Sequence, residues 1–405
     1  MTLTHMPIRL SVRTETDADK DPQAPPRAVA PGLTPPVTPT VLEERSPASS
    51  EPAAPSLPTD VIPSSLEPFT PLPYEGDLEF QYDPKGRPLE YGRGVWSVVY
   101  MASRTSPPSS PLMTPPSSPA PGSRLVAVKS PARKDAHAVL DAEGQTLTRI
   151  TSVPGSEHHV VPFHGYIAES HSLVMSAVPL SLATYIEDKA GLAQKQLSTR
   201  TMFDPVQGLS QWQDLARKLI AGLHWLHSAS HVVHGDIKPH NLLLQPRSAA
   251  AAAAADGFPF DVLFADFSSA HSIAGDSLSA VKGSAATTAL TALTPPFAAP
   301  ELLSVSSLTS PDVAPTPASD VFSLAVTLLA AATGDLLIYP GASSMQRLAM
   351  AREGHRVIEF ARSGPSGSRV PRNGLVERII APALCKDPAK RILPGDWLDL
   401  VNAAA

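Results

Sequence analysis

The sequence predicts an α+β fold with two lobes, a small one built on an antiparallel sheet and a larger one that is mainly helical. Short valine-rich runs occupy the first half of the chain, whereas the second half carries longer runs with helical periodicity. Hydrophobic residues make up 42% of the 405 residues, which is enough for one substantial core. The 45 prolines indicate that a sizeable part of the chain lies outside regular structure.

Three low-complexity blocks interrupt the regions that can fold. Residues 1–73 are rich in Pro, Ser and Thr and hold too few large apolar groups to offset the entropy of ordering, so we expect a disordered tail. A block at about 105–123 repeats PPSSP and is expected to be a disordered insert, and an alanine run at about 247–258 is expected to be an exposed insert. The small lobe then spans residues 74–177 and the large lobe residues 178–405.

Hydrophobic periodicity places the regular elements between these blocks. Four valine-rich runs predict the strands of one antiparallel sheet: Val95–Ala102, Arg124–Lys129, Val160–Ile167 and Ser172–Ala177. Residues 135–150 and 212–229 have helical spacing of their apolar residues, and Ser210 is the expected N-cap of the second helix. The apolar run from Val321 to Thr333 is too short to cross a bilayer and predicts a buried helix.

Charge and cysteine content exclude several classes of protein. The net charge of −6 gives no overall reason to expect nucleic-acid binding, and no run predicts membrane insertion. Cys385 is the only cysteine, so the chain forms no internal disulfide and fits an intracellular location, cytoplasmic or nuclear. The first fourteen residues faintly resemble a mitochondrial presequence, but Pro7 breaks the helix that such a signal requires.

The first candidate site residues lie in the β-rich half. Gly92 and Gly94 occupy a turn between two strands, where the missing Cβ atoms let backbone amides approach phosphate oxygens. A plain hairpin turn is the alternative interpretation. Lys129 ends an apolar strand and is expected to point into a cleft, and Glu143 on the following helix could reach Lys129 and fix it against a polyphosphate.

The decisive segment is His234 to Asn241, directly after the long helix. Asp236, Lys238 and Asn241 supply a proton acceptor, a cation for a transferring phosphate and a metal ligand within six residues. Asp266 ends a later apolar strand, where its carboxylate is well placed to bind Mg²⁺. A polar turn leaving a helix explains neither this spacing nor the flanking apolar runs.

In this order the motifs resemble the eukaryotic protein kinase family, over roughly residues 89–400. The resemblance implies a two-lobed kinase fold with a five-stranded sheet, and transfer of the γ-phosphoryl group of ATP to serine or threonine of protein substrates. Lys129 would hold the α- and β-phosphates and pair with Glu143, Asp236 would accept the proton of the substrate hydroxyl, and Lys238 would touch the γ-phosphate. Asn241 and Asp266 would hold Mg²⁺.

The same resemblance implies an adenine site and a structural framework. Met175 falls at the gatekeeper position, and Ser176 to Val178 form the hinge. The residues expected to sandwich the purine are Val99, Ala127 and Leu243. The apolar column that joins the lobes would include Leu147, His234 and Phe267. The structural residues would be the ion pair of Glu301 with Arg391, and Asp320 beneath the catalytic loop.

Three positions depart from the family pattern. Ser97 replaces the third glycine of the loop, and Ser268 replaces the glycine after Asp266 and Phe267, which restricts the backbone there. Gly235 replaces the arginine that clamps an activation-loop phosphate in many kinases. We therefore expect activity that does not depend on phosphorylation of the loop at about 269–298. Alanine at its threonines is then expected to leave turnover within a few-fold: Thr287, Thr288, Thr291 and Thr294.

Two further hypotheses stay open at this point. A pseudokinase, which binds nucleotide or presents a surface without phosphotransfer, is the alternative function, although every charged residue that catalysis needs is present. In the tail and first insert, Ser-Pro and Thr-Pro pairs such as Thr34-Pro35 and Thr70-Pro71 could be substrates of proline-directed kinases. A plain Pro/Ser-rich spacer explains these pairs equally well.

Overall fold

The computed structural model describes residues 70–105, 124–247, 257–273 and 294–404, except 197, 200, 305, 308–312 and 342. The tail predicted for residues 1–73 therefore falls outside the described residues up to Phe69. Most of both predicted inserts, and residues 274–293 of the predicted activation loop, fall outside them as well.

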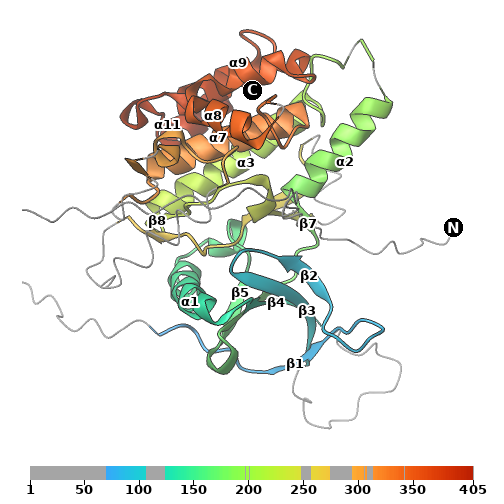
Figure 1. Cartoon of the computed structure of the whole chain (residues 1–405), viewed down its shortest axis with the longest axis vertical. Helices are drawn as coiled ribbons and strands as arrows, with labels where there is room; N and C mark the ends of the chain where they lie inside the picture. Colours follow the sequence, from blue (N-terminus) through green and yellow to red (C-terminus); the bar gives the residue numbers. More distant parts are fainter. Residues whose placement is uncertain are drawn as a thin grey trace, which may run out of the picture. The chain divides into compact units, whose positions relative to one another are not determined.

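The smaller lobe is a curled antiparallel sheet in the order β1-β3-β4-β6-β5, and β2 also pairs with β3 (Figure 1). Its strands are β1 Asp77–Phe80, β2 Glu90–Arg93, β3 Ser97–Thr105, β4 Arg124–Pro131, β5 Phe163–Ile167 and β6 Ser172–Ser176. The sheet has the five strand positions that were expected. The first of them is occupied by two short strands, β1 and β2, which pair with different parts of β3. The antiparallel sheet predicted for the smaller lobe is confirmed.

Residue alternation gives this sheet two different faces. Ala102, Val126, Val128 and Val174 are buried together on one face. On the other face, Lys129 lies opposite Val99 on one side and Leu173 on the other. Successive side chains of a strand point to opposite faces, so the second face carries every other residue of β4 and faces the rest of the protein.

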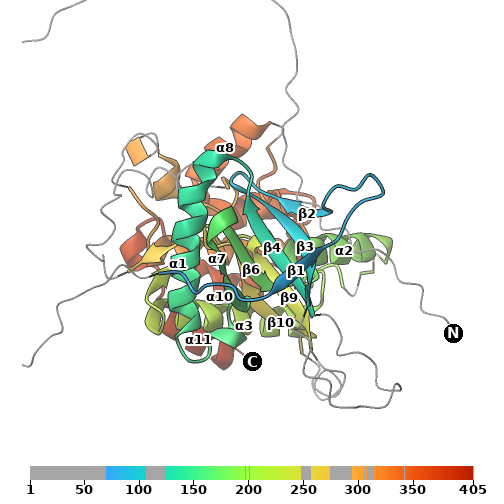
Figure 2. The ribbon, with the colours of Figure 1, turned by 90° about the horizontal axis from the view of Figure 1, so that it is seen from below.

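Helix α1, His137–Thr151, follows β4 and covers one face of the sheet through Leu147 and Ile150. The segment before β1 runs across this helix (Figure 2). The backbone N–H of Leu72 donates to Thr148 Oγ1 at 2.9 Å, and its carbonyl accepts from the backbone N–H of Tyr166 at 2.7 Å. Leu72, which falls within the predicted tail, is therefore part of the folded lobe, because it pairs with α1 and β5.

The larger lobe is mainly helical (Figure 1). Its α-helices are α2 Leu182–Lys195, α3 Leu209–Ser228, α7 Pro317–Thr333, α8 Ser344–Arg352, α9 Val357–Ser363, α10 Leu375–Ile380 and α11 Pro394–Ala403. Short strands complete it: β7 Leu180–Ser181, β8 Val232–Val233, β9 Leu242–Pro246, β10 Phe260–Phe264 and β11 His271–Ser272. None of the helices in the described ranges has both the length and the hydropathy needed to span a bilayer.

Helix α7 is the buried helix that the apolar run predicts. It starts in a capping box of Thr316 and Ser319, with Pro317 at its first position, and ends at Gly334, whose φ of 77° is left-handed. Nearly all of its residues are buried, so it forms the centre of the large core. The predicted N-cap of α3 is wrong: the helix begins after Gly208, so Ser210 lies inside its first turn.

Candidate functional site

The centre of the site is a buried ammonium group held by two carboxylates. Lys129 Nζ lies 2.7 and 2.6 Å from the two carboxylate oxygens of Glu143, and 2.7 Å from Asp266 Oδ1. The side chains of Lys129 and Glu143 are 5% and 0% exposed, whereas that of Asp266 is 41% exposed. We call these three residues the cleft triad. Its carboxylates come from α1 and from the end of β10, so it joins the two lobes.

The backbone around Asp266 is fixed from both lobes. Phe267 donates its N–H to Glu143 Oε1 at 3.0 Å, and its ring lies 4.8 Å from that of His234. Leu147 and Phe267 belong to one buried cluster. Asp266 itself has a φ of 63°, a left-handed conformation that is uncommon for a residue with a side chain.

The second half of the site is the loop after β8. Lys238 Nζ donates to Asp236 Oδ2 at 2.6 Å, and Asn241 Nδ2 donates to the Asp236 carbonyl at 2.8 Å and to Oδ2 at 3.0 Å. Below the loop, the buried carboxylate of Asp320 accepts the N–H groups of His234 and Gly235 at 2.8 and 3.0 Å. Asp320 therefore fixes the loop backbone, and the three loop side chains converge.

Burial and neighbouring charges shift the pKa values of the two aspartates of the site. Burial raises the pKa of Asp236 above its ordinary value, Lys238 opposes this rise, and the charge of Asp266 adds to it. A raised pKa makes this carboxylate a better proton acceptor. Burial alone would raise the pKa of Asp266 too, but Lys129 lowers it well below its ordinary range. Asp266 therefore stays ionised, as a carboxylate must to bind a metal ion.

The residues predicted to form the adenine site share the inner face of the sheet or lie beside it. Ala127 is opposite Met175, and Lys129, two residues on, is opposite Val99, so these four residues lie on one face. Leu243, on β9, packs with Met175 and Val178 in a small cluster below this face. Ser176 turns its hydroxyl toward His164 Nε2 at 3.0 Å. Val99, Ala127, Lys129 and Met175 thus share one face of the sheet, and Leu243 and Val178 pack beside Met175.

Gly92 and Gly94 lie in the hairpin that joins β2 to β3. Gly94 donates its N–H to the Ser97 carbonyl at 2.8 Å, and the register of the two strands shifts between Glu90 and Gly92. No helix follows, as expected, because β3 continues directly into the sheet. The hairpin geometry by itself fits both interpretations of this turn, a phosphate-binding loop and a plain connection.

The oxygen atoms at the site suit a magnesium ion. Asp266 Oδ2 and the Asn241 amide oxygen accept no hydrogen bond from the described residues, while the other polar atom of each side chain is bonded. Mg²⁺ prefers such oxygen ligands and commonly takes only one or two from the protein, with phosphates and water supplying the rest. No group of three or more His, Cys, Asp or Glu residues within the described ranges could hold a metal.

Gly235 has a structural reason to be glycine. Its φ is 80°, and a Cβ atom there would lie 2.6 Å from the carbonyl oxygen of Ser269. A side chain at this position requires the loop or residue 269 to move. The expectation that activity is independent of loop phosphorylation concerns a loop of which residues 274–293 lie outside the described ranges, and it stays a prediction.

Thr294 belongs to the site, although sequence reasoning missed it. Lys238 Nζ donates to its hydroxyl oxygen at 2.9 Å, and that hydroxyl donates to Asp236 Oδ1 at 3.5 Å. These bonds speak against free replacement of Thr294, although the expectation about turnover stays a prediction, and Thr287, Thr288 and Thr291 lie outside the described residues. The signal available in the sequence is the apolar stretch that resumes at Phe297, close after Thr294, and the structure shows that this stretch is buried.

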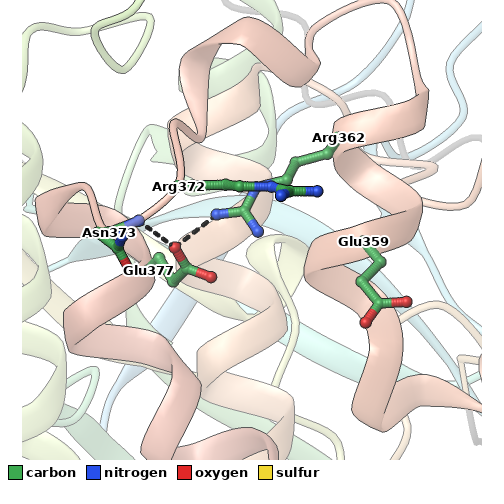
Figure 3. Close-up of a pocket in the computed structure, with 5 residues that line it drawn as sticks. All are labelled: Glu359, Arg362, Arg372, Asn373 and Glu377. Atoms are coloured by element: carbon green, nitrogen blue, oxygen red, sulfur yellow. Dashed lines mark hydrogen bonds and ion pairs between the residues drawn. The ribbon is translucent and has the colours of Figure 1, made fainter.

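A pocket elsewhere in the large lobe holds none of the predicted site residues. Figure 3 shows its lining residues, which come from α9, α10 and the segment between them: Glu359, Arg362, Arg372, Asn373 and Glu377. Arg362 lies 2.6 Å from Glu377, which also accepts the backbone N–H of Asn373 at 2.6 Å. Its charges are mixed and largely paired, so the pocket shows no selectivity for one ligand charge.

Comparison with known proteins agrees with this geometry. The sequence model of the protein kinase domain matches residues 121–399, which include the cleft triad and the loop with Asp236. No curated protein matches the chain significantly. The family assignment therefore rests on the domain model and on the arrangement of the residues themselves.

Proposed function

The chain belongs to the protein kinase family, and we propose that it transfers the γ-phosphoryl group of ATP to serine and threonine hydroxyls of protein substrates. Enzymes of this family use ATP and Mg²⁺. The observation that carries the proposal is the convergence of the cleft triad with Asp236, Lys238 and Asn241, because phosphoryl transfer depends on positioning and charge neutralisation by such groups.

Asp236 would orient the substrate hydroxyl and accept its proton. As the hydroxyl oxygen forms its bond to the γ-phosphorus, the bond between that phosphorus and the bridging oxygen of ADP breaks, and the electron pair leaves with ADP. Lys238, 2.6 Å from Asp236, lies where it would neutralise the transferring group. Lys129, fixed by Glu143, would hold the phosphates that remain with ADP.

Asp266 and Asn241 would hold the magnesium ion, which when bound neutralises the negative charge of the phosphates. The free oxygen atoms of these two side chains support this assignment. The protein's own contribution is to keep both ligands in place, because Asp236 fixes the amide of Asn241 and Lys129 fixes one oxygen of Asp266.

Thr294 supports the choice of an aliphatic hydroxyl as acceptor. Its side chain shows that a hydroxyl group of this size can bond to Lys238 and Asp236 together. The lysine at position 238 also resembles serine/threonine kinases more than tyrosine kinases. Both observations favour serine and threonine over the longer, rigid tyrosine side chain.

Labelled ATP tests the proposal directly. The full chain is incubated with γ-labelled ATP, Mg²⁺ and a generic protein substrate, beside an Asp236→Asn control, and the labelled amino acids are identified. We expect phosphoserine and phosphothreonine, with a rate at least about 10²-fold lower in the control, since general-base catalysis typically contributes 10² to 10⁴-fold. Nucleotide binding without any Asp236-dependent transfer would instead identify a pseudokinase.

A further inference from the structure

Ser268 forms a contact that glycine, the usual residue at this position in the family, cannot form. Its hydroxyl donates a hydrogen bond to Asp266 Oδ1 at 2.8 Å. The sequence alone indicates only that a serine restricts the backbone here. The structure shows in addition a direct link from this side chain to the carboxylate expected to bind the metal.

The two donors on Asp266 act on the same oxygen atom. Oδ1 accepts from Lys129 Nζ at 2.7 Å and from the Ser268 hydroxyl at 2.8 Å. A carboxylate held by one donor retains freedom to rotate about its Cβ–Cγ bond, whereas two donors arriving from different residues define its plane. The other oxygen, Oδ2, accepts no hydrogen bond from the described residues and belongs to a side chain that is 41% exposed.

The backbone at this point needs such support. Asp266 has a left-handed φ of 63°, and the next N–H, that of Phe267, is bonded to Glu143 Oε1 at 3.0 Å. Ser268 lies at the other end of this short segment, and its hydroxyl bonds back to the Asp266 side chain. Its hydroxyl thus holds the carboxylate within a segment whose backbone is already constrained.

We propose that Ser268 is a positioning residue, whose hydroxyl orients the Asp266 carboxylate so that Oδ2 faces a divalent ion bound with nucleotide. This inference rests on the proposed function insofar as that function assigns Asp266 to the metal. Ser268 touches neither substrate nor phosphate and acts through Asp266 alone. Hydrogen bonds of this kind to metal-binding carboxylates typically affect metal affinity strongly.

The test measures metal binding rather than catalysis. Full-length Ser268→Ala, Ser268→Gly and Ser268→Thr are each titrated with Mn²⁺ in the presence of a non-hydrolysable ATP analogue, and bound Mn²⁺ is followed by electron paramagnetic resonance. We expect the apparent Mn²⁺ affinity to fall about tenfold in the alanine and glycine variants. Threonine keeps the hydroxyl and is expected to stay within about threefold of the unmodified chain.

Ser269→Ala is the matched control. The Ser269 hydroxyl is buried and has no hydrogen-bond partner among the described residues, so its loss is expected to leave Mn²⁺ affinity unchanged. The glycine variant guards against misfolding of the alanine variant, because glycine is the residue that the family fold accommodates here. Equal Mn²⁺ affinity in the unmodified chain and both hydroxyl-free variants would overturn the proposal, as would failure of threonine to restore it.

The two proposals fail in different ways. Loss of Mn²⁺ affinity in the hydroxyl-free variants of a chain that transfers no phosphate supports the role of Ser268 and contradicts only the proposed function. Phosphotransfer by a chain whose Mn²⁺ affinity does not change on substitution of Ser268 supports the proposed function and contradicts only the role of Ser268. An unmodified chain that binds the analogue without any Mn²⁺ overturns the positioning role.

Discussion

Two buried ion-pair networks in this protein use similar groups for different purposes. The cleft triad joins one lysine to two carboxylates, whereas the support pair, Glu301 with Arg391, joins one arginine to one carboxylate. Both arginine-to-carboxylate contacts of the support pair measure 2.7 Å. The contact distances are therefore alike, and the difference lies in charge balance and exposure.

The support pair is complete within the protein. Arg391 is 1% exposed and Glu301 is 29% exposed, and beyond Glu301 the arginine donates to the carbonyls of Cys385 at 3.0 Å and Ala318 at 2.9 Å. The cleft triad carries one more negative than positive charge, and its third member, Asp266, is 41% exposed. The support pair balances its charges within the fold, whereas the cleft triad has an excess negative charge and a partly exposed carboxylate, so it retains the capacity to bind a cation.

The largest expected difference between the two networks is in their response to matched carboxylate-to-amide substitutions. Glu301→Gln leaves the buried Arg391 charge unpaired and is expected to lower the free energy of unfolding by about 3 kcal/mol. Asp266→Asn leaves the Lys129 to Glu143 pair intact and is expected to change that free energy by less than about 1 kcal/mol. It is nevertheless expected to abolish phosphotransfer. Urea unfolding and labelled-ATP assays measure the two effects, and equal destabilisation would contradict the distinction.

Replacement of Thr294 is expected to have an intermediate effect. Thr294→Ala removes a hydroxyl bonded to Lys238 and Asp236, and hydrogen bonds to charged groups contribute about 1.5–3 kcal/mol. We therefore expect turnover to fall about tenfold or more, since about 1.4 kcal/mol corresponds to tenfold.

The matched control for Thr294 is the combined alanine replacement of three loop threonines: Thr287, Thr288 and Thr291. If activity is independent of loop phosphorylation, this variant keeps turnover within a few-fold. Steady-state kinetics that showed the reverse order, with the triple variant more impaired than Thr294→Ala, would refute both expectations.

The smallest predicted effect concerns the segment that holds α1. Thr148→Val removes the acceptor of the Leu72 N–H, and it also removes a bond to the Gly144 carbonyl within the helix. Thr146→Val removes only such a bond within the helix, to Ala142. We expect Thr148→Val to be less stable than Thr146→Val by about 1 kcal/mol in urea unfolding.

That comparison also tests whether the cleft triad depends on the placement of α1. Because Glu143 lies on α1, Thr148→Val is expected to raise the KM for ATP modestly relative to Thr146→Val. Identical stability and KM in the two variants would show that the segment before β1 does not hold the helix.

Much of the fold follows from local sequence patterns. Alternating valines around Lys129, the capping residues of α7 and the apolar face of α3 each act within one element, so their patterns identify strands and helices directly. The start of α3 and the backbone pairing of Leu72 do not follow from local preference, because a glycine at the helix start and a partner on another element override it.

The sequence by itself determined the residue types of the site and their order along the chain, because spacing within a loop or strand is a local property. The tertiary structure alone decided that Lys129 meets Asp266, 137 positions away, and that Thr294 meets Lys238. It also decided that the Ser268 hydroxyl turns back to Asp266. These contacts depend on how the lobes close and on side-chain orientation, and neither is encoded in any single segment.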